Sequence, residues 1–165
     1  VLKFDIGGSE KVGVNANGLV FNADTAAANA LNDYEEGSFS PIIRTIGSST
    51  GQKTGTGRYT KIGNKVTIQV QFDDKNCSAI QSNNNIQIAN IPYTANSYPC
   101  TSTVPFAYNV DWNGDRVQSF VTANNTTTLT GFESRSGGSW QYWASNNFRK
   151  SQIYLRFNLT YFTNS

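Results

Sequence analysis

The segment ALNDYEEGSFSP, residues 30–41, holds residues whose types and spacing could do chemistry. Asp33, Glu35 and Glu36 lie around Tyr34. A pair of carboxylates roughly 5–9.5 Å apart can hydrolyse a glycosidic bond. The segment has no local group of aromatic residues that would build a sugar cleft. We therefore interpret it as a solvated boundary between two structural units, whose carboxylates pair with Lys or Arg of a neighbouring chain or of the following unit.

Two other acidic stretches suggest a cation site only superficially. Asp73 and Asp74 close a strand-like run, where a polar turn is the better interpretation. In NVDWNGD, residues 109–115, an EF-hand would need Glu at its twelfth position, which is Phe120. The Asn-Gly dipeptide in this stretch instead favours a hairpin turn. The sequence therefore predicts no metal site and no cofactor.

Composition narrows the function classes. The chain of 165 residues has no His and a net charge of +2, with its Lys and Arg residues scattered. Without His it lacks the commonest general base and metal ligand, and without a basic run it lacks a nucleic-acid footprint. It also has no apolar run of about 18 residues that would span a membrane. We expect a non-enzymatic protein with no nucleic-acid partner and no membrane insertion.

Cys77 and Cys100 are the two cysteines, and 22 residues separate them. Neither cysteine belongs to a CxxC pair, so we expect no zinc site. Both a disulfide and two small buried apolar residues fit the sequence at this point.

A period-two pattern dominates the chain after Pro41. The runs KVTIQVQF, residues 65–72, and IYLRFNLTYF, residues 153–162, alternate apolar with polar residues. Such alternation is typical of half-buried antiparallel strands. The inward positions are Val66, Ile68, Val70, Phe72, Ile153, Leu155, Phe157, Leu159 and Tyr161. Together with several shorter runs they predict an all-β antiparallel β-sandwich, jelly-roll-like, over residues 37–165.

Residues 1–36 read differently. VLKFDI, KVGV and GLVFN are short extended pieces, and an Ala-rich helix is predicted at about residues 24–36 with Asp24 as its N-cap. Neither part can bury a core alone, so each needs a partner, and the small residues permit close approach of several copies around an axis. The candidate residues of that axis are Val14, Ala27, Ala30, Leu31 and Tyr34.

Aromatic residues near predicted loop ends are the candidates for binding. In SWQYWAS, residues 139–145, Trp140 and Tyr142 share one face of an extended chain and Trp143 takes the other. An exposed indole beside Asn, Gln and Ser is suited to stacking on a sugar ring. The candidate receptor-contact residues are Tyr108, Asp111, Trp112, Asn113, Asp115, Arg116, Arg135, Trp140, Tyr142 and Trp143.

Two stretches carry a resemblance to a known family. Residues 17–41, NGLVFNADTAAANALNDYEEGSFSP, and residues 56–72, TGRYTKIGNKVTIQVQF, resemble the C-terminal region of tail fibres of marine bacteriophages. In those fibres a stretch like LDDYEEGTWTP precedes a β-rich tip with a stretch like YTKIGNRV. This sequence departs from that pattern at Asn32, at Ser38-Phe39-Ser40 and at Lys65, and beyond Asn76 the likeness is only general.

The resemblance implies a homotrimeric fibre on the outside of a virion. Residues 1–36 would be a shaft and trimerisation segment, joined to an upstream shaft and other virion proteins. Residues 37–165 would be the tip that binds a host-surface glycan or outer-membrane protein. The chain has no N-terminal Met and starts inside a strand-like run, so we expect it to be the C-terminal part of a longer polypeptide.

Two alternatives to a tail-fibre tip stay open. A polysaccharide depolymerase would need two carboxylates in one groove, and the distal candidates are Glu133, Asp111 and Asp115. A head fibre or capsid decoration protein would use the same module without any change in the pattern.

Overall fold

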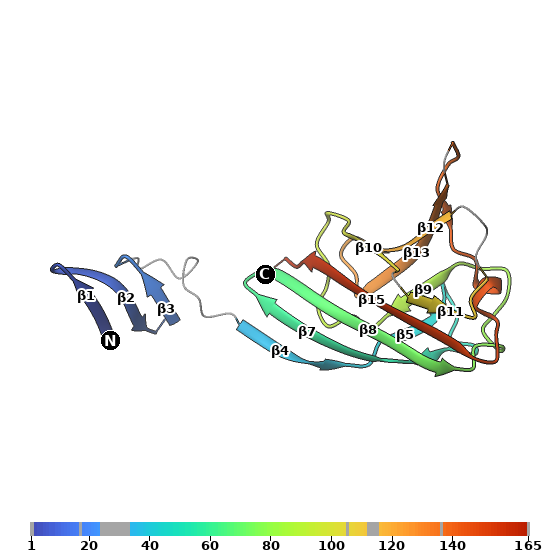
Figure 1. Cartoon of the computed structure of the whole chain (residues 1–165), viewed down its shortest axis with the longest axis horizontal. Coiled ribbons are helices and arrows are strands. Elements are labelled where there is room, and N and C mark those ends of the chain that lie inside the picture. Colours follow the sequence, from blue (N-terminus) through green and yellow to red (C-terminus); the bar gives the residue numbers. More distant parts are fainter. Residues whose placement is uncertain are drawn as a thin grey trace. The chain divides into compact units, whose positions relative to one another are not determined.

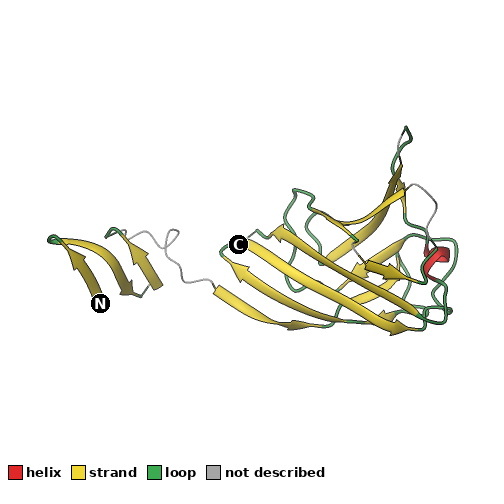
Figure 2. Ribbon diagram, in the orientation of Figure 1, coloured by secondary structure: helices red, strands yellow, loops and turns green. Residues whose placement is uncertain are grey.

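The computed structural model describes residues 2–16, 18–23, 34–104, 106–111, 116–135 and 137–164. Within these ranges the regular structure is β-strand, apart from a short 3-10 helix at Ser145–Phe148 (Figure 2). The strand pairs resolved within the described residues are antiparallel, which confirms the predicted all-β antiparallel class. Contacts divide the chain into two units. One contains Val1–Glu35 and Lys61–Gly63, and the other contains Glu36–Thr60 and Asn64–Ser165.

The first unit holds a three-stranded sheet of β1 (Leu2–Ile6), β2 (Ser9–Asn15) and β3 (Gly18–Phe21). Strand alternation collects apolar side chains on one face of it. Two cross-strand rows form this β1–β3 apolar face: Leu2, Val14 and Leu19, then Phe4, Val12 and Phe21. Phe4 is 67% exposed and Leu2 64% exposed, so this small sheet leaves its apolar face open within one chain.

The second unit is built from two larger sheets (Figure 1). The five-stranded sheet has the order β11 (Phe106–Tyr108), β15 (Ile153–Phe162), β8 (Lys65–Lys75), β7 (Thr56–Ile62), β4 (Tyr34–Phe39). The seven-stranded sheet has the order β10 (Thr101–Thr103), β12 (Arg116–Thr122), β13 (Thr128–Arg135), β9 (Ile86–Ala89), β5 (Ile42–Thr45), β6 (Lys53–Thr54), and β14 (Gln141–Tyr142) pairs with β13.

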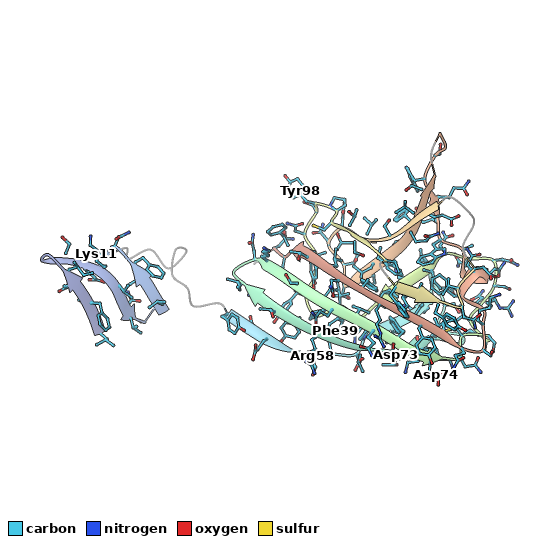
Figure 3. All side chains as sticks on the ribbon, in the orientation of Figure 1. Lys11, Phe39, Arg58, Asp73, Asp74 and Tyr98 are labelled. Carbon is cyan, nitrogen blue, oxygen red and sulfur yellow. The ribbon has the colours of Figure 1, made fainter. Side chains whose placement is uncertain are left out.

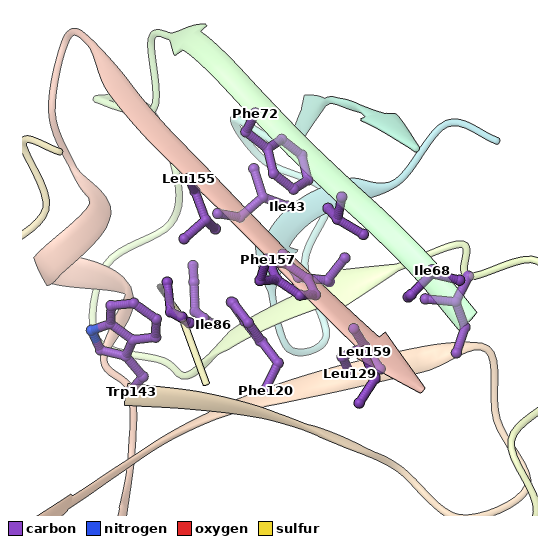
Figure 4. Close-up of a cluster of buried hydrophobic side chains, with 14 of the residues drawn as sticks. Ile43, Ile68, Phe72, Ile86, Phe120, Leu129, Trp143, Leu155, Phe157 and Leu159 are labelled. Carbon is purple, nitrogen blue, oxygen red and sulfur yellow. The ribbon is translucent and has the colours of Figure 1, made fainter. Parts of the chain in front are cut away.

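The inner faces of these two sheets share one hydrophobic core (Figure 4). Phe120 of β12 stacks on Phe157 of β15 with ring centroids 4.8 Å apart, which joins the two sheets directly. The inward positions predicted for β8 and β15 are all buried, with at most 3% of each residue exposed. The period-two prediction is therefore confirmed for both strands.

The predicted helix at about residues 24–36 is wrong at its C-terminal end. Residues 24–33 lie outside the described ranges, but Tyr34, Glu35 and Glu36 belong to β4, which pairs with β7. At Gly37 an added Cβ would lie 2.9 Å from the Tyr59 ring, so the glycine admits that ring against the strand. Pairing with a neighbouring strand thus overrides the local helical preference.

The predicted hairpin at the Asn-Gly dipeptide is also wrong. The strands before and after it, β11 and β12, belong to different sheets, so they do not pair with each other. Residues 112–115, which include the dipeptide, lie outside the described ranges.

The two cysteines are free thiols, which removes the disulfide alternative. Cys77 is fully buried in the shared core, and its N–H donates to the Lys150 carbonyl oxygen at 2.8 Å. Cys100 is half-buried, and its N–H donates to the Thr122 hydroxyl at 2.8 Å. Both cysteines therefore act as small packing residues.

We expect Phe157→Ala to lower the free energy of unfolding by about 3–5 kcal/mol, because it removes a buried ring that bridges the two sheets. Phe162→Ala is the matched control on the same strand, where 39% of the side chain is exposed. That change should cost less than about 1 kcal/mol. Urea denaturation measures both. Equal losses would contradict the assignment of Phe157 to the central core.

Burial raises the pKa of the Cys77 thiol from its ordinary value of 9.0 to about 11. Between these values the thiol is ionised in the unfolded chain and protonated in the folded one. Unfolding then releases a proton, so the free energy of unfolding should fall as pH rises from about 9. Denaturation at pH 8, 9 and 10 in reducing buffer tests this. Cys77→Ala should reduce the fall in the free energy of unfolding with pH, and Cys100→Ala should leave that fall unchanged. An unchanged fall in Cys77→Ala would refute the role of the Cys77 thiol.

Candidate functional site

An exposed aromatic cluster lies on β13, on β14 and on the residue just before β14, on the outer face of the seven-stranded sheet. It consists of Phe132, Trp140 and Tyr142, and we call it the aromatic cluster. Phe132 and Tyr142 are cross-strand partners with ring centroids 4.9 Å apart. Trp140 meets Phe132 at 5.1 Å and Tyr142 at 5.6 Å, both edge to face. Trp140 is 61% exposed and Tyr142 45% exposed, so the cluster offers aromatic surface to a ligand.

Strand alternation sends the next residue, Trp143, into the core. Trp143 is fully buried and packs against Phe148 at 4.4 Å and Phe120 at 5.8 Å. The backbone N–H of Trp143 donates to the Gly131 carbonyl oxygen at 2.9 Å, and its backbone carbonyl accepts from the Ile86 N–H at 2.8 Å. These bonds hold β14 in place, so Trp143 is a core residue that positions the cluster. The prediction that Trp143 contacts a receptor at the surface is therefore wrong.

Polar side chains surround the aromatic cluster. Ser119 is the cross-strand partner of Phe132 on β12, and Thr130 and Ser134 precede and follow Phe132 on the same face of β13. Hydroxyl groups beside flat, exposed rings can bond the hydroxyls of a sugar while the rings cover its apolar face. The sequence anticipated Trp140 and Tyr142 but not Phe132, which joins them only through strand pairing.

The remaining candidate contacts do not form one site with the cluster. Tyr108 lies on β11 in the other sheet, 59% exposed and 5.9 Å from the Tyr154 ring. Asp111 forms an ion pair with Lys150 at 2.8 Å. Arg116 and Arg135 are Cα partners in the β12–β13 pair. Trp112, Asn113 and Asp115 lie outside the described residues.

The carboxylates considered for hydrolysis are differently placed. Glu133 is only 5% exposed, on the inward side of β13, while the Asp111 side chain is 59% exposed. Near the expected boundary, Glu35 pairs with Lys61 at 3.2 Å, and both residues belong to the first unit. Asp115 and Asp33 lie outside the described residues. Burial of Glu133 is unsuited to a group that must reach a large polysaccharide.

A second surface, not anticipated as a site, is a groove on the outer face of the five-stranded sheet. We call it the sheet groove, and its volume is about 790 Å³. Its lining comes from β4, β7, β8 and β15 and comprises Ser38, Phe39, Ser40, Thr56, Gly57, Arg58, Gln69, Val70, Gln71, Arg156, Phe157 and Asn158. The polar positions of the alternating strands were visible in the sequence, but their alignment across four strands was not.

An ion pair fixes one end of the sheet groove. The Arg156 guanidinium donates to both oxygens of Asp73, at 3.0 and 2.8 Å, and lies 5.5 Å from the centre of the Phe106 ring. This hydrogen bonding lowers the pKa of Asp73 and raises that of Arg156. Gln71 also donates to Asp73. Figure 3 labels Asp73 and Arg58 among the side chains of this unit.

No group of three His, Cys, Asp or Glu side chains in the described ranges is arranged to hold a metal ion. The same ranges contain no helix long and apolar enough to cross a membrane.

Comparison with known proteins gives one structural likeness. No family model and no curated protein sequence matches the chain. The fold is similar to part of the crystal structure of the Dettilon tailspike protein, with a TM-score of 0.63 and 16% sequence identity. The match covers 82% of this chain and 25% of the tailspike, so the chain spans about a quarter of that protein's length. At this identity the likeness concerns the fold alone.

Proposed function

We propose that this chain is part of a phage tail protein that attaches the virion to the surface of its host. The observation that carries the proposal is the fold shared with a phage tailspike protein over 82% of the chain. The tail-fibre-like stretches at residues 17–41 and 56–72 support it independently, because they are a sequence likeness rather than a fold likeness. The proposed role is adhesive and non-enzymatic.

The aromatic cluster is the proposed contact with a host glycan. Three mutually packed rings form a rigid platform that loses little conformational freedom on binding. Trp140 and Tyr142 pack edge to face on each other, and the next residue, Trp143, is buried in the core. A sugar that stacks there would meet the Ser119 and Thr130 hydroxyls at its rim.

A homotrimer is the proposed assembly. The β1–β3 apolar face presents two complete apolar rows to solvent within one chain, and three strands alone make a marginal unit. Threefold packing of these faces would bury Leu2, Phe4 and Val14, at about 25 cal/mol for each Å² of apolar surface. Three copies also turn weak glycan contacts into strong overall attachment.

We expect the 165-residue chain to show three times the mass of 18.1 kDa in light scattering at micromolar concentration. The trimer of the variant Phe4→Ser, Val14→Ser should dissociate at a protein concentration at least about tenfold higher than the wild-type trimer. The reason is that both substitutions remove apolar surface from the β1–β3 apolar face. Asp5→Ser on the opposite face of β1 is the control and should keep the mass. A wild-type monomer would refute the trimer.

Trp140→Ala should reduce binding of the fluorescently labelled chain to a panel of marine Gram-negative bacteria by at least about fivefold, a loss of about 1 kcal/mol per site. Tyr98→Ala is the matched control, since Tyr98 is 76% exposed and lies outside the aromatic cluster. Flow cytometry measures the bound fraction, and thermal unfolding checks that both variants fold. Equal binding by Trp140→Ala and the wild type would contradict the proposed contact.

A further inference from the structure

The floor of the sheet groove is a grid of outward side chains in register. Gln71 on β8 is the partner of Arg156 on β15, and Gln69 is the partner of Asn158. Beyond the groove lining, the next row of the same face pairs Thr67 with Thr160, whose hydroxyls lie 3.0 Å apart. The grid is a direct product of the alternation that buries Val66, Ile68, Val70 and Phe72.

The chemistry of this grid matches hydroxyl groups. Amide side chains offer a donor and an acceptor, and threonine hydroxyls can play either role. Sugar hydroxyls have the same double character, so a row of amides can bond successive hydroxyls without leaving a buried polar atom unpaired. The outward positions of the groove floor are polar, and Val70 and Phe157 face the core, so the floor is poorly suited to an acyl chain.

The groove lining carries two positive charges, and a neighbouring carboxylate balances one of them. The lining contains Arg58 and Arg156 but no carboxylate, while Glu36 lines the adjoining hollow that shares Arg58 with the groove. Asp73, just outside the lining, neutralises and fixes Arg156. Arg58 is exposed, and among the described residues it has no hydrogen-bond or ion-pair partner. Its guanidinium can therefore take two oxygens of a carboxylate on a ligand.

An aromatic edge borders the same surface. Phe106 and Tyr108 on β11 are the cross-strand partners of Arg156 and Tyr154. Phe106 is 47% exposed and Tyr108 59% exposed. A sugar at this edge of the groove would find a ring to stack on, and its neighbours in the chain would lie over the amides.

We propose that the sheet groove is a second binding site, separate from the aromatic cluster, that takes an extended acidic oligosaccharide lying across β15, β8, β7 and β4. Four strands spaced about 4.8 Å apart give a floor about 14 Å wide, which accommodates a chain rather than one sugar. The groove volume of about 790 Å³ lies within the usual range for ligand sites. Arg58 binds a carboxylate substituent, and Gln69, Gln71 and Asn158 bind hydroxyls.

A second copy of the chain is a poorer occupant of this groove. Interfaces between identical subunits are apolar at their centre, about 65% by area, and depleted of charge. The groove floor has amides, hydroxyls and guanidinium groups instead. The surface of this chain with the composition of such an interface is the β1–β3 apolar face.

The test is titration of the ¹⁵N-labelled full chain with two defined probes, an alginate hexasaccharide, which carries a carboxylate on every sugar, and neutral cellohexaose. We expect alginate to shift backbone signals of β7, β8 and β15 with millimolar affinity, and cellohexaose to bind at least fivefold more weakly. Arg58→Ala should weaken the alginate-induced shifts of β7, β8 and β15 at least fivefold, and Arg58→Lys should restore part of the affinity. Tyr98→Ala, at a residue that is 76% exposed and outside both surfaces, should leave it unchanged.

Several outcomes would overturn the proposal. These are failure of alginate to bind, shifts confined to the aromatic cluster, equal affinity for both probes, or unchanged affinity in Arg58→Ala. A lower molar mass of Arg58→Ala in light scattering would show that a second copy covers the groove. The proposed attachment role is judged separately, by the binding of Trp140→Ala to whole cells, so failure of one proposal does not imply failure of the other.

Discussion

Everything on the surface of the second unit depends on the contact between its two sheets. Phe120 and Phe157 stack across the interface, and the residues above and below them on β12 and β15 follow the same inward alternation. Because the period of a strand is two, burying one set of side chains fixes the direction of the other set. The aromatic cluster and the sheet groove are therefore the outward halves of strands whose inward halves make the core.

The two surfaces differ in the kind of recognition they favour. The aromatic cluster is small, apolar and rigid, with Trp143 buried behind it. The sheet groove is wide and polar, and its one fixed charge pair, between Arg156 and Asp73, lies at its edge. Flat rings discriminate little between sugars, while a grid of donors and acceptors is sensitive to hydroxyl stereochemistry. The proposed division is between general adhesion at the cluster and selectivity in the groove.

Alternation made much of this predictable from the sequence. The inward residues of β8 and β15 and the opposite directions of Tyr142 and Trp143 follow from a period of two. The start of β4 was not predictable, because Tyr34–Glu36 are strand only through pairing with β7, more than 20 residues away. The hairpin predicted at the Asn-Gly dipeptide was wrong for a similar reason, since β11 and β12 belong to different sheets. The sheet groove was missed because register across four strands is a tertiary property.

The position of β15 has a consequence for how the protein is made. This strand, Ile153–Phe162, comes last along the sequence, yet it lies inside the five-stranded sheet between β11 and β8. During synthesis β8 therefore cannot pair with β15 until about 80 further residues have been made. Contacts so distant in sequence form slowly and leave strand edges open in the meantime. A nascent chain of this protein is thus aggregation-prone until β15 has been made and can pair with β8.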